Sequence, residues 1–338
     1  MKSRKVHLVG SVPLADNVEV FRATAQHLPG LVSRYPDGEV GRRWIMMQRR
    51  VAAECAQLEP AASRSYTPGP TYEHFQIREG VDPASVEFPP LGYIEPAKAS
   101  YREFHRLRQE GVVPATARFL VTFPTPAAFL WCYIRPDQRA VVEEAYLRRL
   151  HTEVDEIVGS IPNADLAIQW DTAHEVLMIE GARDSMLSRD EHLDRLTRVG
   201  NYVPAAVELG YHFCYGYAAR KHTVEPRDTG LLVEIANALA QQVGRPLSFI
   251  HMPVPRDRDD VAFFRPLADL RLDPRTELYL GLVHMSDGLE GAARRIAAAR
   301  QIVGNFGIST ECGLGARPPE TILPLFRVHT EAAALNPS

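Results

Sequence analysis

Two cysteines and a histidine stand out in this sequence because their side chains could bind one metal ion. His212 and Cys214 lie two positions apart in a short apolar run, and Cys312 follows another such run in Glu311-Cys312-Gly313. Residues i and i+2 of a strand project to the same side about 7 Å apart, so His212 and Cys214 can converge on one ion. Thiolates together with imidazole favour zinc among the available divalent ions. The pattern predicts a Zn²⁺ site, and the alternative interpretation is a pair of buried, inert cysteines and a core histidine.

Polar side chains also stand at or just past the ends of most other apolar runs, namely Ser11, Glu39, Thr122, Asp171, His251 and His284. In a parallel β/α barrel the carboxyl ends of the strands form the mouth that holds the active site. A zinc ion there would lower the pKa of a bound thiol or water and hold that nucleophile in position. For each of these residues taken singly, ordinary polarity at a strand end is the open alternative.

Eight short apolar runs alternate with longer amphipathic segments, which predicts βαβ units and a parallel sheet. The runs are Lys5–Val12, Leu31–Pro36, Ala117–Phe123, Asp165–Asp171, Tyr211–Gly216, Pro246–Met252, Glu277–His284 and Phe306–Glu311. Eight strands close a barrel, and 338 residues suit one such domain better than two. We therefore predict an α/β fold, a single (β/α)₈ TIM barrel over residues 1–338.

The intervening helices have signals of their own. Ser188 followed by Glu191 is typical of a capping box. Apolar residues recur with helical period after Asp137, which predicts a helix packed against the outside of the barrel through Val142, Tyr146, Leu150, Val154 and Ile157.

Residues 60–96 interrupt the alternation. The segment is rich in Pro, Gly and Ser and shows no regular period, yet it carries the aromatic residues Tyr66, Tyr72, Phe75, Phe88 and Tyr93. Loops of this length are uncommon without a function. We predict an irregular insertion after the second βα unit, which is either a lid over the mouth or a packing arm.

The composition favours small-molecule chemistry. A formal net charge of −4 and the lack of a clustered basic stretch argue against nucleic acid or anionic lipid as partners. The apolar run near the N-terminus is too short for a signal peptide or a membrane span, so we expect a cytoplasmic protein. Four cysteines are too few for a disulfide framework in a chain of this size. The sequence does not indicate an oligomeric state.

The motifs together resemble the C-terminal catalytic barrel of cobalamin-independent methionine synthase, within the grouping that includes uroporphyrinogen decarboxylase. His212-Phe213-Cys214-Tyr215 is similar to the family's zinc-binding H-x-C-Y, and Cys312-Gly313-Leu314 is similar to the C-G-L that carries its third zinc ligand. Val9-Gly10-Ser11-Val12-Pro13 resembles I-G-S-x-P, and Asp37-Gly38-Glu39 with Arg42 resembles H-G-E-x-x-R. Thr122-Phe123-Pro124-Thr125 and Ile168-Gln169-Trp170-Asp171 are similar to the L-T-G-P-x-T and Q-x-D-E-P segments.

The resemblance implies roles for several residues. Ser11 and Thr122 would line the substrate site, and Glu39 and Asp171 would bind the amino group of an amino-acid thiol. His284 lies near the family's H-S histidine, which delivers a proton to the departing folate, so His284 and Asp171 are the candidate catalytic residues.

Departures from the family pattern limit how much of its chemistry transfers. The zinc-ligating glutamate of the family is replaced by His251, and Q-D-E-P and N-P-D-C become Asp171-Thr172-Ala173-His174 and Ser309-Thr310-Glu311-Cys312. The N-terminal barrel of the long synthases, which helps hold folate, is also missing. We predict His251 as a fourth zinc ligand and an alkyl group that need not be methyl.

The leading hypothesis is a zinc-dependent methyl- or alkyltransferase that activates a substrate thiol as zinc thiolate. Its partners would be a small-molecule thiol and a methyl or alkyl donor, with a folate among the candidates. Two alternatives stay open: a zinc-dependent lyase or hydrolase on the same barrel, and a non-catalytic homologue that binds thiol or zinc.

Overall fold

The structure is a computed structural model that describes the chain except for residues 1–3, 63, 66–70, 217–221 and 336–338 and the side chains of residues 42–46, 64 and 65. The side chain of Arg42, part of one quoted motif, therefore lies outside the described residues, as does Tyr66.

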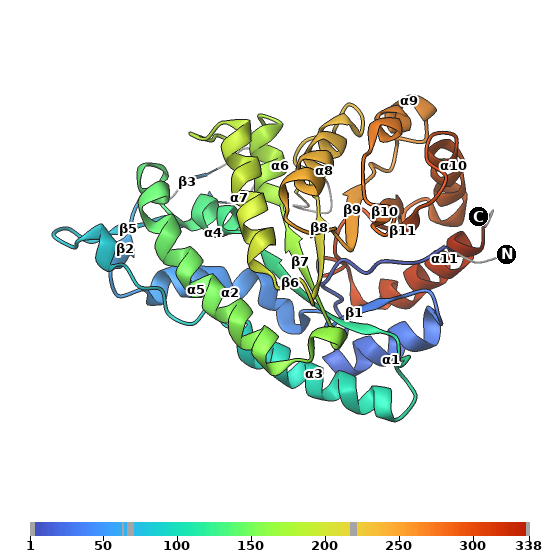
Figure 1. Cartoon of the computed structure of the whole chain (residues 1–338), viewed down its shortest axis with the longest axis horizontal. Helices are drawn as coiled ribbons and strands as arrows, with labels where there is room; N and C mark the ends of the chain where they lie inside the picture. The colour runs from blue at the N-terminus through green and yellow to red at the C-terminus, as the bar shows by residue number, and fades with distance from the viewer. Residues whose placement is uncertain (1–3, 63, 66–70, 217–221, 336–338) are drawn as a thin grey trace.

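A curled sheet of seven parallel strands forms the centre of the molecule (Figure 1). Its strands follow one another in chain order, each paired in parallel with the next. They are β1 (Arg34–Pro36), β6 (Arg118–Pro124), β7 (Leu166–Asp171), β8 (Glu208–His212), β9 (Phe249–Pro253), β10 (Glu277–Val283) and β11 (Gly307–Thr310). Seven of the eight predicted runs thus contribute a strand to one sheet, an arrangement compatible with a TIM barrel.

The eighth predicted run, Lys5–Val12, forms no continuous strand. Val6 instead makes isolated parallel bridges to Val32 on one side and to Ile308 on the other. Ser11 makes a third bridge, to Gly38. This segment therefore lies between β11 and the chain that enters β1, so it spans the two edges of the sheet without regular pairing.

The limits of β8 differ most from the prediction. Tyr211–Gly216 was the expected strand, whereas β8 begins at Glu208 and ends at His212. After His212 the chain turns: Gly216 has a φ of 70°, and the Thr223 N–H donates to the Tyr215 carbonyl at 2.8 Å. Cys214 consequently lies in a loop and not on the strand with His212.

Helices cover the outside of the sheet. They are α1 (Asn17–His27), α2 (Arg43–Glu54), α3 (Ile94–Gln109), α4 (Pro126–Tyr133), α5 (Arg139–Ser160), α6 (Ala173–Ile179), α7 (Arg189–Tyr202), α8 (Gly230–Gln242), α9 (Val261–Phe264), α10 (Gly288–Arg300) and α11 (Ile322–Ala334). The predicted capping box is present at the start of α7, where Ser188 and Glu191 bond each other's backbone N–H groups. The predicted apolar stripe of α5 is buried throughout. No helix in the described part of the chain is long and apolar enough to cross a membrane.

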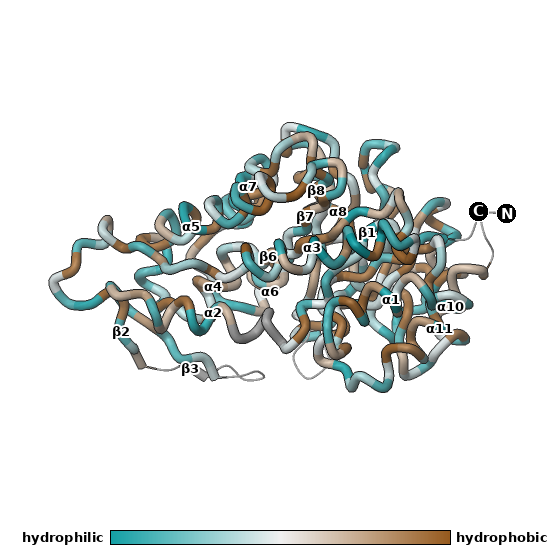
Figure 2. Tube along the Cα trace, turned by 90° about the horizontal axis from the view of Figure 1, so that it is seen from below, coloured by the Kyte–Doolittle hydropathy of each residue, from teal (hydrophilic) through white to brown (hydrophobic). Residues whose placement is uncertain are grey.

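The interrupted segment lies between α2 and α3 and is partly regular. β2 (Leu58–Pro60) pairs antiparallel with β5 (Phe75–Ile77), and β3 (Arg64–Ser65) pairs with β4 (Thr71–Tyr72). Figures 1 and 2 both show this part at the end of the molecule opposite the two termini. Phe88 packs edge-on against Phe129 and Tyr146, so at least this end of the segment serves packing. A lid function stays a prediction.

An ion-pair cluster with a buried arginine lies at the amino ends of the strands. Arg34 at the start of β1 lies 2.6 Å from the carboxylate of Glu208 and 2.5 Å from that of Glu277, and its guanidinium lies 4.3 Å from the ring centre of Phe249. The guanidinium is buried and the two carboxylates are partly exposed, so the pairs compensate the charge of Arg34 at the end of the sheet opposite His212.

Gly210 in β8 faces the ring of Phe249, and a Cβ added at Gly210 would overlap that ring. Phe249 is fixed between Arg34 and His7, so the ring cannot move aside. We predict that Gly210→Ala lowers the free energy of unfolding by about 1–3 kcal/mol, the usual cost of overpacking a core. Urea denaturation followed by circular dichroism measures the change. Gly159→Ala, on the exposed face of α5 with nothing near its added Cβ, is the control and should be neutral or slightly stabilising.

Candidate metal centre

His212, Cys214 and Cys312 form a cluster at the carboxyl end of the sheet. Their ligand atoms all lie within 4.8 Å of one another. The two Sγ atoms are 3.7 Å apart, and Cys312 Sγ is 3.7 Å from His212 Nε2. Tetrahedral zinc with usual bond lengths would place two sulfurs about 3.8 Å apart and a sulfur and a nitrogen about 3.6 Å apart. The two separations that involve Cys312 therefore agree with those of a zinc tetrahedron, and the third lies within 4.8 Å.

Contacts with the N-terminal segment hold the Cys312 loop in place. Ser11 Oγ accepts a hydrogen bond from the Gly315 N–H at 3.1 Å, and the Ser11 carbonyl accepts one from the Leu314 N–H at 2.8 Å. A Cβ at Gly313 would come within 2.5 Å of Ser11 Oγ, so glycine is required for this close approach. Ser11, predicted as a substrate residue, thus serves in this structure to position a candidate ligand.

The electrostatics of the cluster favour a cation. The hydrogen bond with Cys214 and burial raise the pKa of the Cys312 thiol well above its usual range. Burial, with His251 beside it, lowers the pKa of His212 well below that of a free histidine, so its ring is neutral at pH 7. A bound divalent ion would oppose the shift at Cys312, since it would stabilise the thiolate form.

His251 lies behind His212 and not beside the two sulfurs. Its Nδ1 is 2.7 Å from His212 Nδ1, and its Nε2 is 2.9 Å from the carbonyl oxygen of Thr310. Both ring nitrogens are therefore engaged. This geometry departs from the prediction of a direct zinc ligand, because the ring of His251 lies between His212 and the Thr310 carbonyl of β11.

Glu39 and Asp171, the two residues predicted to bind one amine, interact electrostatically. Asp171 ends β7 next to His212, and burial followed by the charge of Glu39 raises its pKa well above the usual range. Glu39 accepts a hydrogen bond from Thr122 Oγ1 at 2.7 Å. Glu39 and Thr122, together with Asp37 and Tyr93, line a hollow in the surface. Two carboxylates that repel each other in this way form a favourable site for an amine.

The backbone at Glu39 is unusual because its φ is 46°. Asp37 Oδ1 accepts a hydrogen bond from the Glu39 N–H at 2.9 Å, and Asp37 Oδ2 accepts one from Ser100 Oγ of α3 at 3.0 Å. These bonds hold Glu39 in a conformation that non-glycine residues rarely adopt.

Gln169 and His7 belong to the site although the sequence did not single them out as functional residues. Gln169 Nε2 donates to Asp171 Oδ1 at 2.8 Å and to the Val9 carbonyl at 2.6 Å. Gln169 Oε1 therefore accepts from His7 Nε2, 2.8 Å away. For Gln169, the signal that could have indicated a functional role was a polar side chain inside the otherwise apolar run Leu166–Trp170.

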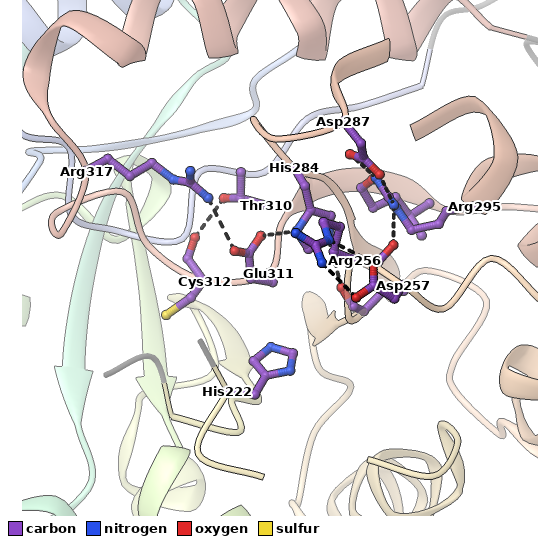
Figure 3. A network of polar contacts seen from close by, with 12 residues as sticks. His222, Arg256, Asp257, His284, Asp287, Arg295, Thr310, Glu311, Cys312 and Arg317 are labelled. Atoms are coloured by element: carbon purple, nitrogen blue, oxygen red, sulfur yellow. Dashed lines mark hydrogen bonds and ion pairs between the residues drawn. The ribbon is translucent and has the colours of Figure 1, made fainter. Parts of the chain in front are cut away.

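His284 belongs to a network of polar contacts that includes Glu311, the residue before Cys312 (Figure 3). Its Nε2 donates to the Val254 carbonyl at 2.9 Å, and its Nδ1 lies 3.1 Å from Glu311 Oε2. Arg317 binds the other oxygen of Glu311 at 3.2 Å. Burial lowers the pKa of His284, and the Glu311 carboxylate opposes that shift. Glu311 and Arg317 were not predicted as site residues, since charged residues beside a cysteine give no sign of what they contact.

Solved structures with a similar fold are known. The chain superposes on a B12-independent methionine synthase from Shewanella sp. W3-18-1 in complex with selenomethionine, with a TM-score of 0.63, 13% identity and coverage of 98% of this chain and 96% of the other. The chain has a methionine synthase-like fold. A methyltransferase from Methanosarcina mazei is also similar, with a TM-score of 0.57, 11% identity and coverage of 98% and 94%. No protein-family model and no curated protein matches the chain.

These identities are low, so the likeness concerns the fold. The coverage of 96% shows that the matched synthase chain is about as long as this one.

The raised pKa of Asp171 predicts a dependence of stability on pH. Between the usual pKa of aspartate and the raised value, the folded protein binds more protons than the unfolded chain, so wild-type stability falls as pH rises through this window. We predict that Asp171→Asn, which keeps the acceptor for Gln169, raises the thermal unfolding midpoint relative to wild type at pH 8 but not near pH 4. Both proteins are measured with a chelator present. The control is Glu79→Gln at an exposed position, and an Asp171→Asn difference that does not change with pH would contradict the prediction.

Proposed function

We propose that the protein is a zinc-dependent thiol methyl- or alkyltransferase with His212, Cys214 and Cys312 as the zinc ligands. The observation that carries the proposal is the convergence of three ligand atoms within 4.8 Å of one another, with both separations from Cys312 Sγ close to those expected around tetrahedral zinc. Three protein ligands are typical of catalytic zinc, because they leave a fourth position open for substrate. When bound, zinc would lower the pKa of a substrate thiol and hold the thiolate for attack on the electrophilic carbon of an alkyl donor.

The carboxylates beside the cluster favour a thiol that also carries an amine. Glu39 and Asp171 would accept hydrogen bonds from an ammonium group, while Thr122 and Gln169 hold the two carboxylates in place. The fold supports the same substrate class, since the matched synthase structure contains selenomethionine, an amino acid. The proposed partners are a small amino-acid thiol and a methyl or alkyl donor, with a folate among the candidates for the donor.

His284 is the proposed proton donor to the departing group of the alkyl donor. Its Nε2 proton is bonded to the Val254 carbonyl, so donation from Nδ1 requires the doubly protonated ring, a form that burial of His284 disfavours. Glu311, which Arg317 holds in place, would stabilise the positive charge of that ring.

Metal content tests the ligand set. We predict about one zinc per chain in the purified protein, because two cysteines and a histidine are already placed for it. Cys214→Ser and Cys312→Ser should each reduce bound zinc to a small fraction, as measured by elemental analysis after dialysis. Cys55→Ser and Cys132→Ser are the controls, because both are buried cysteines outside the cluster and should keep full zinc. Stoichiometric zinc in a Cys214→Ser, Cys312→Ser double variant would refute the assignment.

Thiol binding tests the substrate class without knowledge of the donor. We predict that the zinc-loaded protein binds homocysteine at least about tenfold more tightly than 4-mercaptobutyrate, which lacks the amine, because each charge-assisted hydrogen bond contributes about 1.5–3 kcal/mol. Isothermal titration calorimetry measures both affinities. Glu39→Gln should reduce the difference between the two ligands and leave the affinity for 4-mercaptobutyrate unchanged. Equal affinities in the wild type would refute the amine site and leave the zinc site standing.

A further inference from the structure

We propose that His251 is a positioning residue that fixes the tautomer and the orientation of His212. The inference rests on the proposed function, because it concerns a residue that acts through a proposed zinc ligand. It assigns to His251 a role as hydrogen-bond acceptor for that ligand, in place of metal binding.

A count of protons leads to this assignment. The Thr310 carbonyl can only accept a hydrogen bond, so His251 Nε2, 2.9 Å away, carries a proton. His251 is fully buried at 0% exposure, and a neutral imidazole carries a single proton. Its Nδ1 is therefore an acceptor. The contact of 2.7 Å between the two Nδ1 atoms then requires the proton on His212 Nδ1.

The consequence for His212 is that Nε2 has a free lone pair. This atom faces Cys312 Sγ at 3.7 Å, on the side where the three candidate ligands meet. With the opposite tautomer, a proton on Nε2 would point into the cluster and prevent metal binding. Histidine ligands usually have their other N–H bonded to an acceptor for this reason. His251 supplies that acceptor from a neighbouring strand.

The same contacts connect two ligands through the backbone. His251 on β9 joins His212 on β8 to Thr310 on β11, and Thr310 Oγ1 donates to the Cys312 carbonyl at 2.7 Å. The ring centres of His212 and His251 are 4.7 Å apart, and neither side chain is exposed by more than 2%. Rotation of either ring would break a buried hydrogen bond. These contacts therefore restrict His212 and the Cys312 backbone to one arrangement.

A metal-binding experiment separates this role from direct ligation. Co²⁺ is the probe, because its absorption reports the number and type of ligands, and Zn²⁺ competition gives the affinity. The variants are His251→Gln, which offers an acceptor and a donor, and His251→Leu, which offers neither. The control is His192→Leu, which removes a buried histidine in α7 whose ring contacts Ser185, outside the ligand cluster. Urea denaturation of the metal-free proteins checks that each variant folds.

We expect His251→Leu to bind Co²⁺ about 10–100-fold more weakly than wild type, the usual effect of losing the partner of a histidine ligand. His251→Gln should stay within about threefold of wild type and keep its absorption bands. If both variants weaken equally and the bands of His251→Gln shift, His251 is a ligand and the inference is overturned. Wild-type affinity in His251→Leu also overturns it but leaves the proposed zinc site intact, whereas a wild-type protein that binds neither metal overturns the proposed function as well.

Discussion

Negative charges on two sulfurs 3.7 Å apart would repel each other strongly unless a cation lay between them. This constraint governs the carboxyl end of the sheet. Cys214 and Cys312 are 98 residues apart in sequence, and they meet because the parallel sheet curls until the ends of β8 and β11 face one another. The curl depends in turn on the N-terminal segment, whose residue Val6 bridges both edges.

Polar side chains inside the sheet form hydrogen bonds that fix the direction of each donor. The amide group of Gln169 donates to the Val9 carbonyl and to Asp171. Its oxygen can only accept, so His7 donates to it. A buried polar group without a hydrogen-bond partner destabilises the fold. A set of side chains with only one fully bonded arrangement is therefore rigid. The carboxylate of Asp171 is thereby held at the end of β7, where His212 is the paired residue on β8.

Much of the fold and the members of the candidate metal cluster could be predicted from the sequence. Strands buried on both faces produce continuous apolar runs, and cysteine and histidine at their ends are rare enough to identify His212, Cys214 and Cys312. Other features depend on three-dimensional neighbours that a linear pattern does not contain. His251 ends an apolar run just as a ligand would, yet its direction is set by the proximity of β11 and the Thr310 carbonyl. Likewise, nothing in Lys5–Val12 distinguishes a strand from a segment that makes only isolated bridges.

The backbone at Glu39 is strained, and this strain accompanies the placement of its carboxylate. Among the described residues, it is the one non-glycine residue with a positive φ, a conformation in which glycine would be relaxed and glutamate is strained. Glycine at this position would relieve the backbone strain and would remove the Glu39 carboxylate from the hollow. A glutamate retained where the backbone favours glycine is typical of positions at which a side chain is needed for binding. The strain therefore marks the loop after β1 as a candidate binding surface.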